Sequence, residues 1–196
     1  SEITVLLEIV FEHFLKFNKL DLKTKSQNRL SESELLDFHF TLKRLKLQEP
    51  IQYILGEAPF MGLMLKVDNN VLIPRPETEL IVEWVLDLSL NKNATIFEAG
   101  TGSGCIAISI CLKNKDLKIL ASDLSGQALE VAQINRELHN AFNVTFIQSN
   151  WLACSIENSL DLVISNPPYI KPNDPHLKDL NHEPFIALIT ENGSQS

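Results

Sequence analysis

The chain has 196 residues, 44% of them hydrophobic, and a formal net charge of −8 at pH 7. This is enough to build a hydrophobic core, either in one large domain or in a small domain beside a medium one. The acidic balance argues against a protein that binds nucleic acid through a broad basic surface, because neutralising phosphates requires clustered Lys and Arg. No apolar run approaches the ~20 residues of a membrane span, so we expect no membrane association.

Cysteine and histidine usage predicts neither a disulfide framework nor a metal site. The three cysteines are an odd number without CxxC spacing, and the five histidines are scattered along the chain. They form no Ser-His-Asp pattern and no set of metal ligands. We therefore expect no bound metal, and a reducing cytoplasm is the compartment that fits best.

The first residues carry helical patterns. Apolar residues recur at helical spacing over residues 2–18, which predicts an amphipathic helix. Ser31 and Glu34 have the form of a capping box, which predicts the start of a second helix. A third, short helix begins with a proline and ends at Gly56, the residue types that favour those two positions. We therefore predict a small all-α domain over residues 1–57.

The next segment predicts a β-hairpin linker over residues 58–76. Residues 60–67 and 71–73 are apolar runs, and three polar residues between them supply a turn. Alternate prolines, Pro74 and Pro76, then exclude regular structure until a helix begins near residue 77.

From there on, strand-like apolar runs alternate with helical patterns, which implies an α/β fold with parallel strands and crossover helices. Helices are predicted from residue 105 and over residues 126–139. The predicted strands cover residues 95–99, 119–122, 144–148 and 160–165.

Polar residues follow the first three of these strands. A turn with three alternate glycines comes first, and glycine lets backbone approach a ligand closely; a plain tight turn is the alternative. Asp123 ends the second strand, where a carboxylate can accept hydrogen bonds from both hydroxyls of a ribose, or cap the next helix, as Ser125 also could. Asn150 and Trp151 follow the third strand and suit an adenine, although the indole could equally cover the sheet edge.

The fourth strand ends in Asn166, Pro167, Pro168 and Tyr169. Two prolines remove two backbone donors and fix two φ angles, so the chain must leave the sheet along a stiff, extended path. Asn166 and Tyr169 are thereby presented at the carboxyl end of a strand, where open α/β sheets bind ligands. The alternative is a rigid strand exit whose tyrosine covers the core.

Together these motifs resemble the class I S-adenosylmethionine-dependent methyltransferases that modify planar amide or amine nitrogens. Residues 49–56, 60–63 and 71–79 further resemble the peptide chain release factor glutamine N5-methyltransferases. The resemblance implies a Rossmann-like class I methyltransferase sheet over residues 77–196, preceded by the helical domain and the hairpin. A complete sheet of this class has seven strands. With four predicted, we expect a chain truncated at its C-terminus that folds poorly or is inactive alone, and an active full-length form.

The resemblance also implies the site. S-adenosyl-L-methionine would contact Glu98, Gly100, Thr101, Gly102, Ser103, Gly104, Asp123, Asn150, Trp151 and Asn166. The family usually has Asp where this chain has Glu98 and often where it has Asn150, so we expect changed cofactor affinity more than lost binding. Asn166, Pro167, Pro168 and Tyr169 would hold the substrate glutamine, with Asn166, Pro167 and Tyr169 catalytic.

The implied activity is methylation of the glutamine side-chain nitrogen in the GGQ loop of release factors, with the N-terminal helices gripping the rest of the factor. We expect a cytoplasmic protein that is monomeric at full length and does not bind nucleic acid directly.

Arg75 and Glu77 could anchor the hairpin or help bind substrate. Glu183 could brace the active-site loop or be exposed. Two rival interpretations are an adenine-N6 nucleic-acid methyltransferase and a non-catalytic module that keeps the fold. A nicotinamide dehydrogenase is a third, which the spacing of the glycines disfavours.

Overall fold

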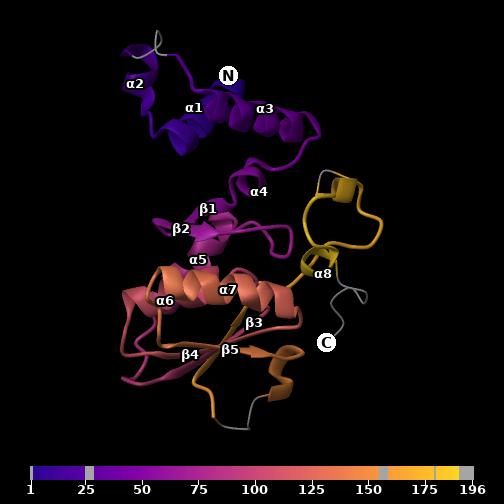
Figure 1. The fold of residues 1–196 in the computed structure, drawn as a ribbon. Helices are drawn as coiled ribbons and strands as arrows, with labels where there is room; N and C mark the ends of the chain where they lie inside the picture. Colours follow the sequence, from indigo (N-terminus) through magenta and orange to yellow (C-terminus); the bar gives the residue numbers. More distant parts are fainter. Residues whose placement is uncertain (1, 25–28, 155–158, 179, 190–196) are drawn as a thin grey trace. The chain divides into compact units, whose positions relative to one another are not determined.

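The computed structural model describes residues 2–24, 29–154, 159–178 and 180–189. The chain divides into two compact units, Ser1–Gly56 and Glu57–Ser196. Regular structure in the described part of the first unit is helical, whereas the second unit combines a hairpin, a sheet and helices (Figure 1). The hairpin therefore belongs to the same compact unit as the sheet.

The first unit packs two helices through aromatic side chains. The ring of Phe38 lies 4.7 Å from that of Phe11 and 5.7 Å from that of Phe14, between centroids. The predicted capping box is confirmed: the Ser31 hydroxyl accepts from the backbone N–H of Glu34, whose carboxylate accepts from Ser31 N–H. The helices of this unit are α1 (Glu2–Leu15), α2 (Lys19–Thr24), α3 (Glu32–Lys46) and α4 (Ile51–Leu55).

The short helix α4 ends as predicted, and an arginine supports its last turn. Gly56 takes the left-handed conformation that closes the helix, with φ 70°. Arg44 donates to the carbonyl oxygens of Tyr53 at 3.2 Å and Ile54 at 3.3 Å, and its Nε lies 2.7 Å from an oxygen of Glu49. Unpaired carbonyls at a helix end are thereby satisfied by a cation. Helix α2 was not predicted, because its six residues carry too little periodicity.

A hairpin is present, but both predicted strands were wrong, because the run over residues 60–67 contains the turn and residues 71–73 form no strand. Strand β1 (Glu57–Phe60) pairs antiparallel with β2 (Leu63–Lys66), so the turn is Met61 and Gly62. Both residues have positive φ, 49° and 77°, as a type I′ hairpin turn requires. The polar residues after β2 form a separate turn, in which Asp68 accepts from the N–H of Asn70 at 2.9 Å.

The central sheet is parallel, with strand order β5-β4-β3-β6. All four predicted strands and both crossover helices are confirmed, with ends that differ by at most two residues from the prediction. The chain moves outward from β3 to β5 and then returns to the other side of β3, so the strand order reverses between β3 and β6. The elements are β3 (Thr95–Ala99), α6 (Cys105–Lys113), β4 (Lys118–Asp123), α7 (Gly126–Leu138), β5 (Val144–Gln148), η2 (Trp151–Cys154) and β6 (Leu162–Ser165).

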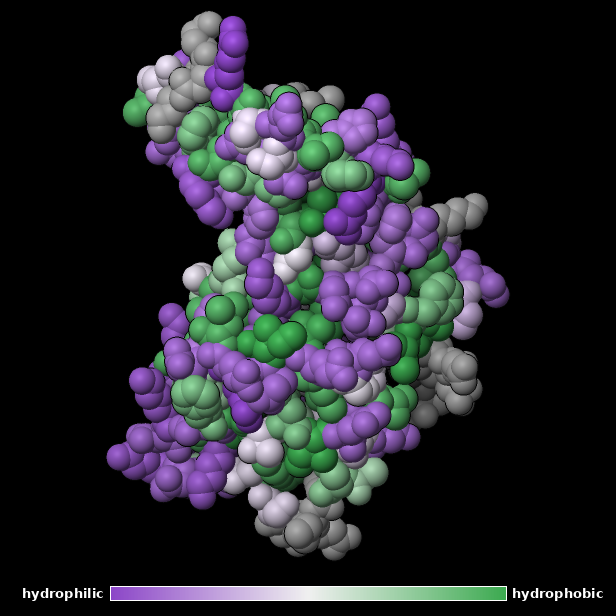
Figure 2. Space-filling view, viewed as in Figure 1, coloured by the Kyte–Doolittle hydropathy of each residue, from purple (hydrophilic) through white to green (hydrophobic). Residues whose placement is uncertain are grey.

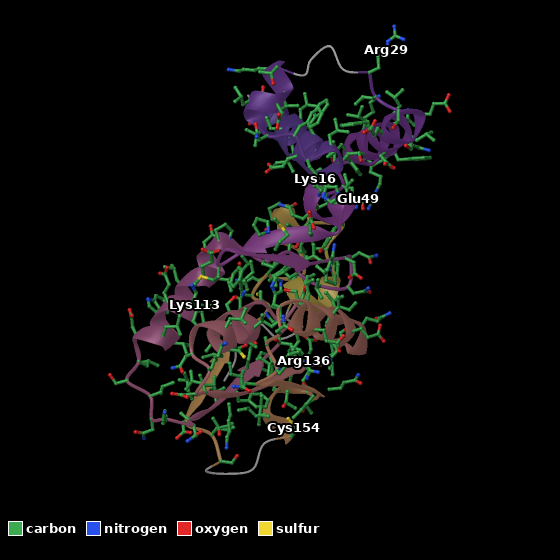
Figure 3. All side chains as sticks on the ribbon, turned by 60° about the vertical axis from the view of Figure 1, so that its left-hand side comes forward. Lys16, Arg29, Glu49, Lys113, Arg136 and Cys154 are labelled. Atoms are coloured by element: carbon green, nitrogen blue, oxygen red, sulfur yellow. The ribbon has the colours of Figure 1, made fainter. Side chains whose placement is uncertain are left out.

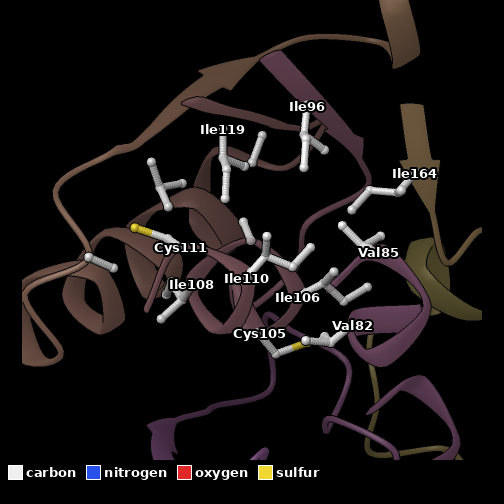
Figure 4. Close-up of a cluster of buried hydrophobic side chains, with 14 of the residues drawn as sticks. Val82, Val85, Ile96, Cys105, Ile106, Ile108, Ile110, Cys111, Ile119 and Ile164 are labelled. Atoms are coloured by element: carbon white, nitrogen blue, oxygen red, sulfur yellow. The ribbon is translucent and has the colours of Figure 1, made fainter. Parts of the chain in front are cut away.

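Helix α6 forms the centre of the core, since its first seven residues are all buried. A helix that is apolar all round must be covered on every side. The sheet supplies Ile96 and Ile119, and the preceding helix α5 (Glu79–Asp87) supplies Val82 and Val85 (Figure 4). A single 3-10 turn, η1 (Pro76–Thr78), leads into α5, because the prolines delay the start of the α-helix.

Helix α7 connects the hairpin to the turn after β3 and also contacts β5. Asn135 is fully buried and accepts from the N–H of Lys66 at 2.6 Å, while its amide donates to the carbonyl oxygens of Lys66 and Ser103, each at 2.9 Å. Arg136, labelled in Figure 3, donates to the carbonyl oxygen of Val144 at 3.2 Å. Asn135 thus joins the hairpin to the turn that follows β3.

The surface mixes hydrophilic residues with exposed hydrophobic ones (Figure 2). Among the described residues, no helix is both long and apolar enough to cross a membrane. All three cysteines are free; Cys105 and Cys111 are buried in α6, and Cys154 is exposed in η2. The last described elements are η3 (Pro175–Lys178) and α8 (Phe185–Leu188).

Candidate active site

The sheet brings the predicted site residues to one edge. In the register of the sheet, Ala99 of β3 lies opposite Ser122 of β4 and Ser165 of β6. The residues that follow these three strands therefore converge at the point where the strand order reverses, which is where open α/β sheets bind ligands. A cavity of about 390 Å³ lies there, lined by Glu98, Gly100, Thr101, Gly102, Ser103, Asp123, Asn150, Trp151, Asn166, Pro167 and Pro168 among others.

The glycines of the turn after β3 serve two purposes. Gly100 and Gly102 have φ of 75° and 55°, and a Cβ on either would meet no atom within 4 Å, so both keep the cavity wall open. Gly104 does not line the cavity. A Cβ there would lie 2.9 Å from Ile108 and 3.2 Å from Phe146, so this glycine allows α6 to pack closely against β5.

Asp123 supports the glycine turn from the neighbouring strand. Its carboxylate accepts from the N–H of Gly102 at 2.9 Å and from the N–H of Ser125 at 3.0 Å. The cap of α7 is Ser125, whose hydroxyl accepts from the N–H of Ala128. Asp123 is therefore not the cap, and its carboxylate, which lines the cavity, retains lone pairs for a ligand.

Glu98 is a buried carboxyl group with one satisfied oxygen. Oε2 accepts from the hydroxyl of Thr101 at 2.7 Å and from the N–H of Ala107 at 3.1 Å. Oε1 is buried and has no hydrogen-bond partner among the residues that the structure describes. Burial raises the pKa of Glu98 from 4.5 to about 8, and the negative charge of Asp123 adds to this effect.

We expect the buried Glu98 to make stability depend on pH. Between pH 4.5 and 8 the folded chain holds a proton that the unfolded chain has lost, so the free energy of unfolding should fall as pH rises, by up to about 1.4 kcal/mol per pH unit. Glu98→Gln cannot titrate and should lose less stability. Urea unfolding of both proteins at pH 5 and pH 8 measures the difference. Parallel pH profiles would show that Glu98 ionises normally.

Within the described part of the chain, a second buried polar atom at this cavity has no hydrogen-bond partner. Among the described residues, the hydroxyl oxygen of Ser103 is also buried without a partner, and Ser103 lines the same cavity. A polar group left unsatisfied in a protein interior costs free energy. A ligand that brings donors, such as the ammonium and hydroxyl groups of S-adenosylmethionine, fits these two oxygens.

Asn150 and Trp151 line the same cavity from the end of β5. Trp151 is 53% exposed and has a positive φ of 49°, which is uncommon for a bulky residue. The indole is thus about half-exposed at the edge of the sheet. It is available to a flat ligand at this edge.

Asn166 stands between two cavities. A second cavity, of about 350 Å³, is lined by Tyr169 and Ile170 but by none of the glycine turn. Tyr169 is 77% exposed and so does not cover the core. The side-chain amide nitrogen of Asn166 donates to the hydroxyl of Thr78 at 3.3 Å. Both cavities share the residues Leu72, Arg75, Thr78, Asn166, Pro167 and Ala187.

Glu183 is a brace between distant segments. It is 6% exposed; its Oε2 accepts from the N–H of Ile73 at 3.2 Å, and its Oε1 forms an ion pair with Arg75. Glu183 is therefore buried rather than exposed, and Arg75 is joined to it, while Arg75 and Glu77 both line the second cavity. Sequence reasoning missed Thr78 as a site residue, although it lies in the proline-flanked segment that carried the family resemblance.

In the described part of the chain, His, Cys, Asp and Glu side chains form no group able to hold a metal ion.

Residues 77–185 match the family model of the methyltransferase small domain. The catalytic domain of hMettl16, solved with a MAT2A 3'UTR hairpin, has a similar fold: the TM-score is 0.53, with 20% identity over 67% of this chain and 52% of that chain. The family model and this likeness thus define a methyltransferase with the class I fold.

The particular family follows from the whole chain. Residues 4–56 match the PrmC N-terminal domain. The release factor glutamine methyltransferase of Flavobacterium psychrophilum is 41% identical over 97% of this chain and 70% of its own length. That of Lactococcus lactis is 41% identical over 95% and 69%. The chain belongs to the release factor glutamine methyltransferase family and spans about 70% of the length of these relatives.

Proposed function

We propose that this protein transfers a methyl group from S-adenosyl-L-methionine to the side-chain amide nitrogen, N5, of the glutamine in the GGQ loop of a peptide chain release factor. The names of its relatives supply the substrate class. The observation that carries the chemistry is that Asn166 and Pro167 line both cavities. The cavity beside the glycine turn then takes the cofactor, and the other takes the glutamine.

The cofactor residues divide by the part of the cofactor that they would hold. Glu98 and residues 100–103 would surround the methionine portion. The cofactor's ammonium group would favour the ionised form of Glu98, whose oxygen Oε1 would then accept a hydrogen bond from it. Asp123 would hold the ribose, and Asn150 and Trp151 the adenine. The second carboxylate oxygen of Glu98 already supports Thr101 and Ala107, so the longer side chain reaches the loop and the ligand together.

A carboxamide nitrogen is a poor nucleophile, because its lone pair is delocalised into the carbonyl group. When bound, S-adenosylmethionine supplies an electrophilic methyl group on a sulfonium sulfur, which keeps the bonding electron pair. Asn166 Oδ1 and the carbonyl oxygen of Pro167 accept from the two N–H groups of the glutamine. They hold its nitrogen in line with the methyl group and stabilise the positive charge that develops there. A proton then leaves the nitrogen for solvent. Tyr169 packs on the flat amide.

The other expectations extend this proposal. We infer that the helical domain, residues 1–57, contacts the release factor outside its glutamine loop. The hairpin segment, residues 58–76, would connect it to the methyltransferase domain, residues 77–196. The same proposal includes that the protein acts as a monomer and that it does not bind nucleic acid directly. The net charge of −8 supports the second point. A translation factor as substrate puts the reaction in the cytoplasm.

Transfer of radiolabelled methyl from S-adenosylmethionine tests the function. We expect label on an unmethylated release factor and none on a release factor whose GGQ glutamine is replaced by asparagine, because the shorter side chain does not reach Asn166 and Pro167. A naked DNA or RNA oligonucleotide serves as the competing substrate. Label on adenine and none on the release factor would instead establish the adenine-N6 interpretation.

A further inference from the structure

The side-chain amide of Asn166 combines an oxygen that accepts hydrogen bonds with a nitrogen that donates them, so its orientation decides what it can bind. Its Oδ1 can accept a hydrogen bond from the NH2 group of a glutamine, whereas its Nδ2 can only donate. In the productive complex Oδ1 must face the substrate, since Nδ2 would place a donor against a donor. Nδ2 then points into the protein and needs an acceptor there.

The structure provides that acceptor from a distant segment. Nδ2 of Asn166 donates to the hydroxyl oxygen of Thr78 at 3.3 Å, across 88 positions of sequence. Thr78 is 7% exposed and, like Asn166, lines both cavities. Oδ1 of Asn166 has no partner among the described residues, so it is available to a substrate.

We propose that Thr78 is a positioning residue for the methyl transfer, whose hydroxyl holds the Asn166 carboxamide with Oδ1 free for the substrate amide. This inference rests on the proposed function. Thr78 touches neither reacting atom in this scheme and acts through Asn166 alone.

Both ends of this contact are fixed by other interactions. The N–H of Thr78 donates to the carbonyl oxygen of Arg75 at 3.0 Å, and Arg75 is held by the buried Glu183. On the other side, the Ser165 hydroxyl next to Asn166 donates to the carbonyl oxygen of Ala99 at 2.8 Å. The hydroxyl of Thr78 therefore meets the amide at a set position rather than through two mobile side chains.

The segment that contains Glu183 also supports the other end of residues 166–169. Glu183 precedes α8, and the N–H of Ile170 donates to the carbonyl oxygen of Leu188 at 3.0 Å. Residues 166–169 thus lie between a strand that is paired in the sheet and a residue that is bonded to α8. Thr78 supplies the remaining contact, to the side chain itself.

Thr78→Val and Thr78→Ser test the proposal. Valine keeps the shape of threonine but cannot accept a hydrogen bond, so the productive complex would bury an unsatisfied N–H. We expect kcat for release factor methylation to fall about tenfold or more, with the dissociation constant of S-adenosylmethionine, measured by calorimetry, within about twofold. Thr78→Ser restores the acceptor and should recover most of kcat.

Thr145→Val is the matched control, because Thr145 is exposed on β5 and lines neither cavity. It should leave kcat unchanged. A Thr78→Val protein as active as the unmodified protein would overturn the proposal. So would an equal loss of kcat in Thr78→Ser and Thr78→Val, since this would indicate packing rather than the hydroxyl group. A full-length form without these substitutions that transfers no methyl group to release factor would instead reject the proposed function.

Discussion

Replacing Asn166 with alanine is expected to abolish methyl transfer to the release factor, lowering kcat by roughly 10³-fold or more. The substitution removes the acceptor that meets the positive charge developing on the substrate nitrogen, and it removes nothing that the glycine turn or Asp123 provides. The dissociation constant of S-adenosylmethionine should therefore stay within about a few fold. A radiolabelled-methyl assay and calorimetry measure the two quantities separately.

Asn91→Ala is the control for this experiment, because Asn91 is an exposed asparagine ahead of β3 and lines neither cavity. It should retain full turnover. Retained turnover in Asn166→Ala would remove Asn166 from the chemistry. Loss of cofactor binding along with turnover would mean that Asn166 shapes the first cavity rather than the substrate amide.

Asp123→Asn is expected to raise the dissociation constant of S-adenosylmethionine by about 10- to 100-fold, equivalent to about 1.4 to 2.8 kcal/mol. The carboxylate accepts on both oxygens, from the N–H groups of Gly102 and Ser125. An amide has one accepting oxygen, so its NH2 would face one of these donors and disturb the glycine turn. The ribose would also lose a charged acceptor.

Calorimetric titration measures this effect, with Glu130→Gln as a charge-matched control on the exposed face of α7. The control should bind the cofactor as the unmodified protein does. Unchanged affinity in Asp123→Asn would contradict the ribose role and leave Asp123 only a support for the turn. The two substitutions together distinguish the two cavities, because Asn166→Ala should affect turnover and Asp123→Asn should affect cofactor affinity.

The hairpin shows where local patterns misled. The apolar run before the polar residues 68–70 and the short run after them have the composition of two strands, but the turn is made earlier, by Met61 and Gly62. A glycine inside an apolar run does not disclose its φ. The left-handed conformation of both turn residues, which sets the register, became visible only in the folded chain.

The central sheet was predictable because its signals are local. Apolar runs of strand length alternate with helical periods, and glycine, proline and capping residues mark the ends of the elements. The same holds for the motifs, since residues that follow parallel strands must meet at one edge of the sheet whatever the strand order. Asp123, Trp151 and Asn166 could therefore be assigned to one site from sequence.

Sequence alone thus determined the class of fold, the helical first unit, and many of the residues that line the first cavity, although not Thr78. Tertiary structure decided the contacts that join positions far apart in the chain. Thr78 meets Asn166 across 88 positions and Arg75 meets Glu183 across 108. It also decided that Glu98 is buried with one orphaned oxygen, which raises the pKa of this carboxyl group. Local periodicity carries no information about such pairs, because strand order and side-chain burial arise only when the elements pack together.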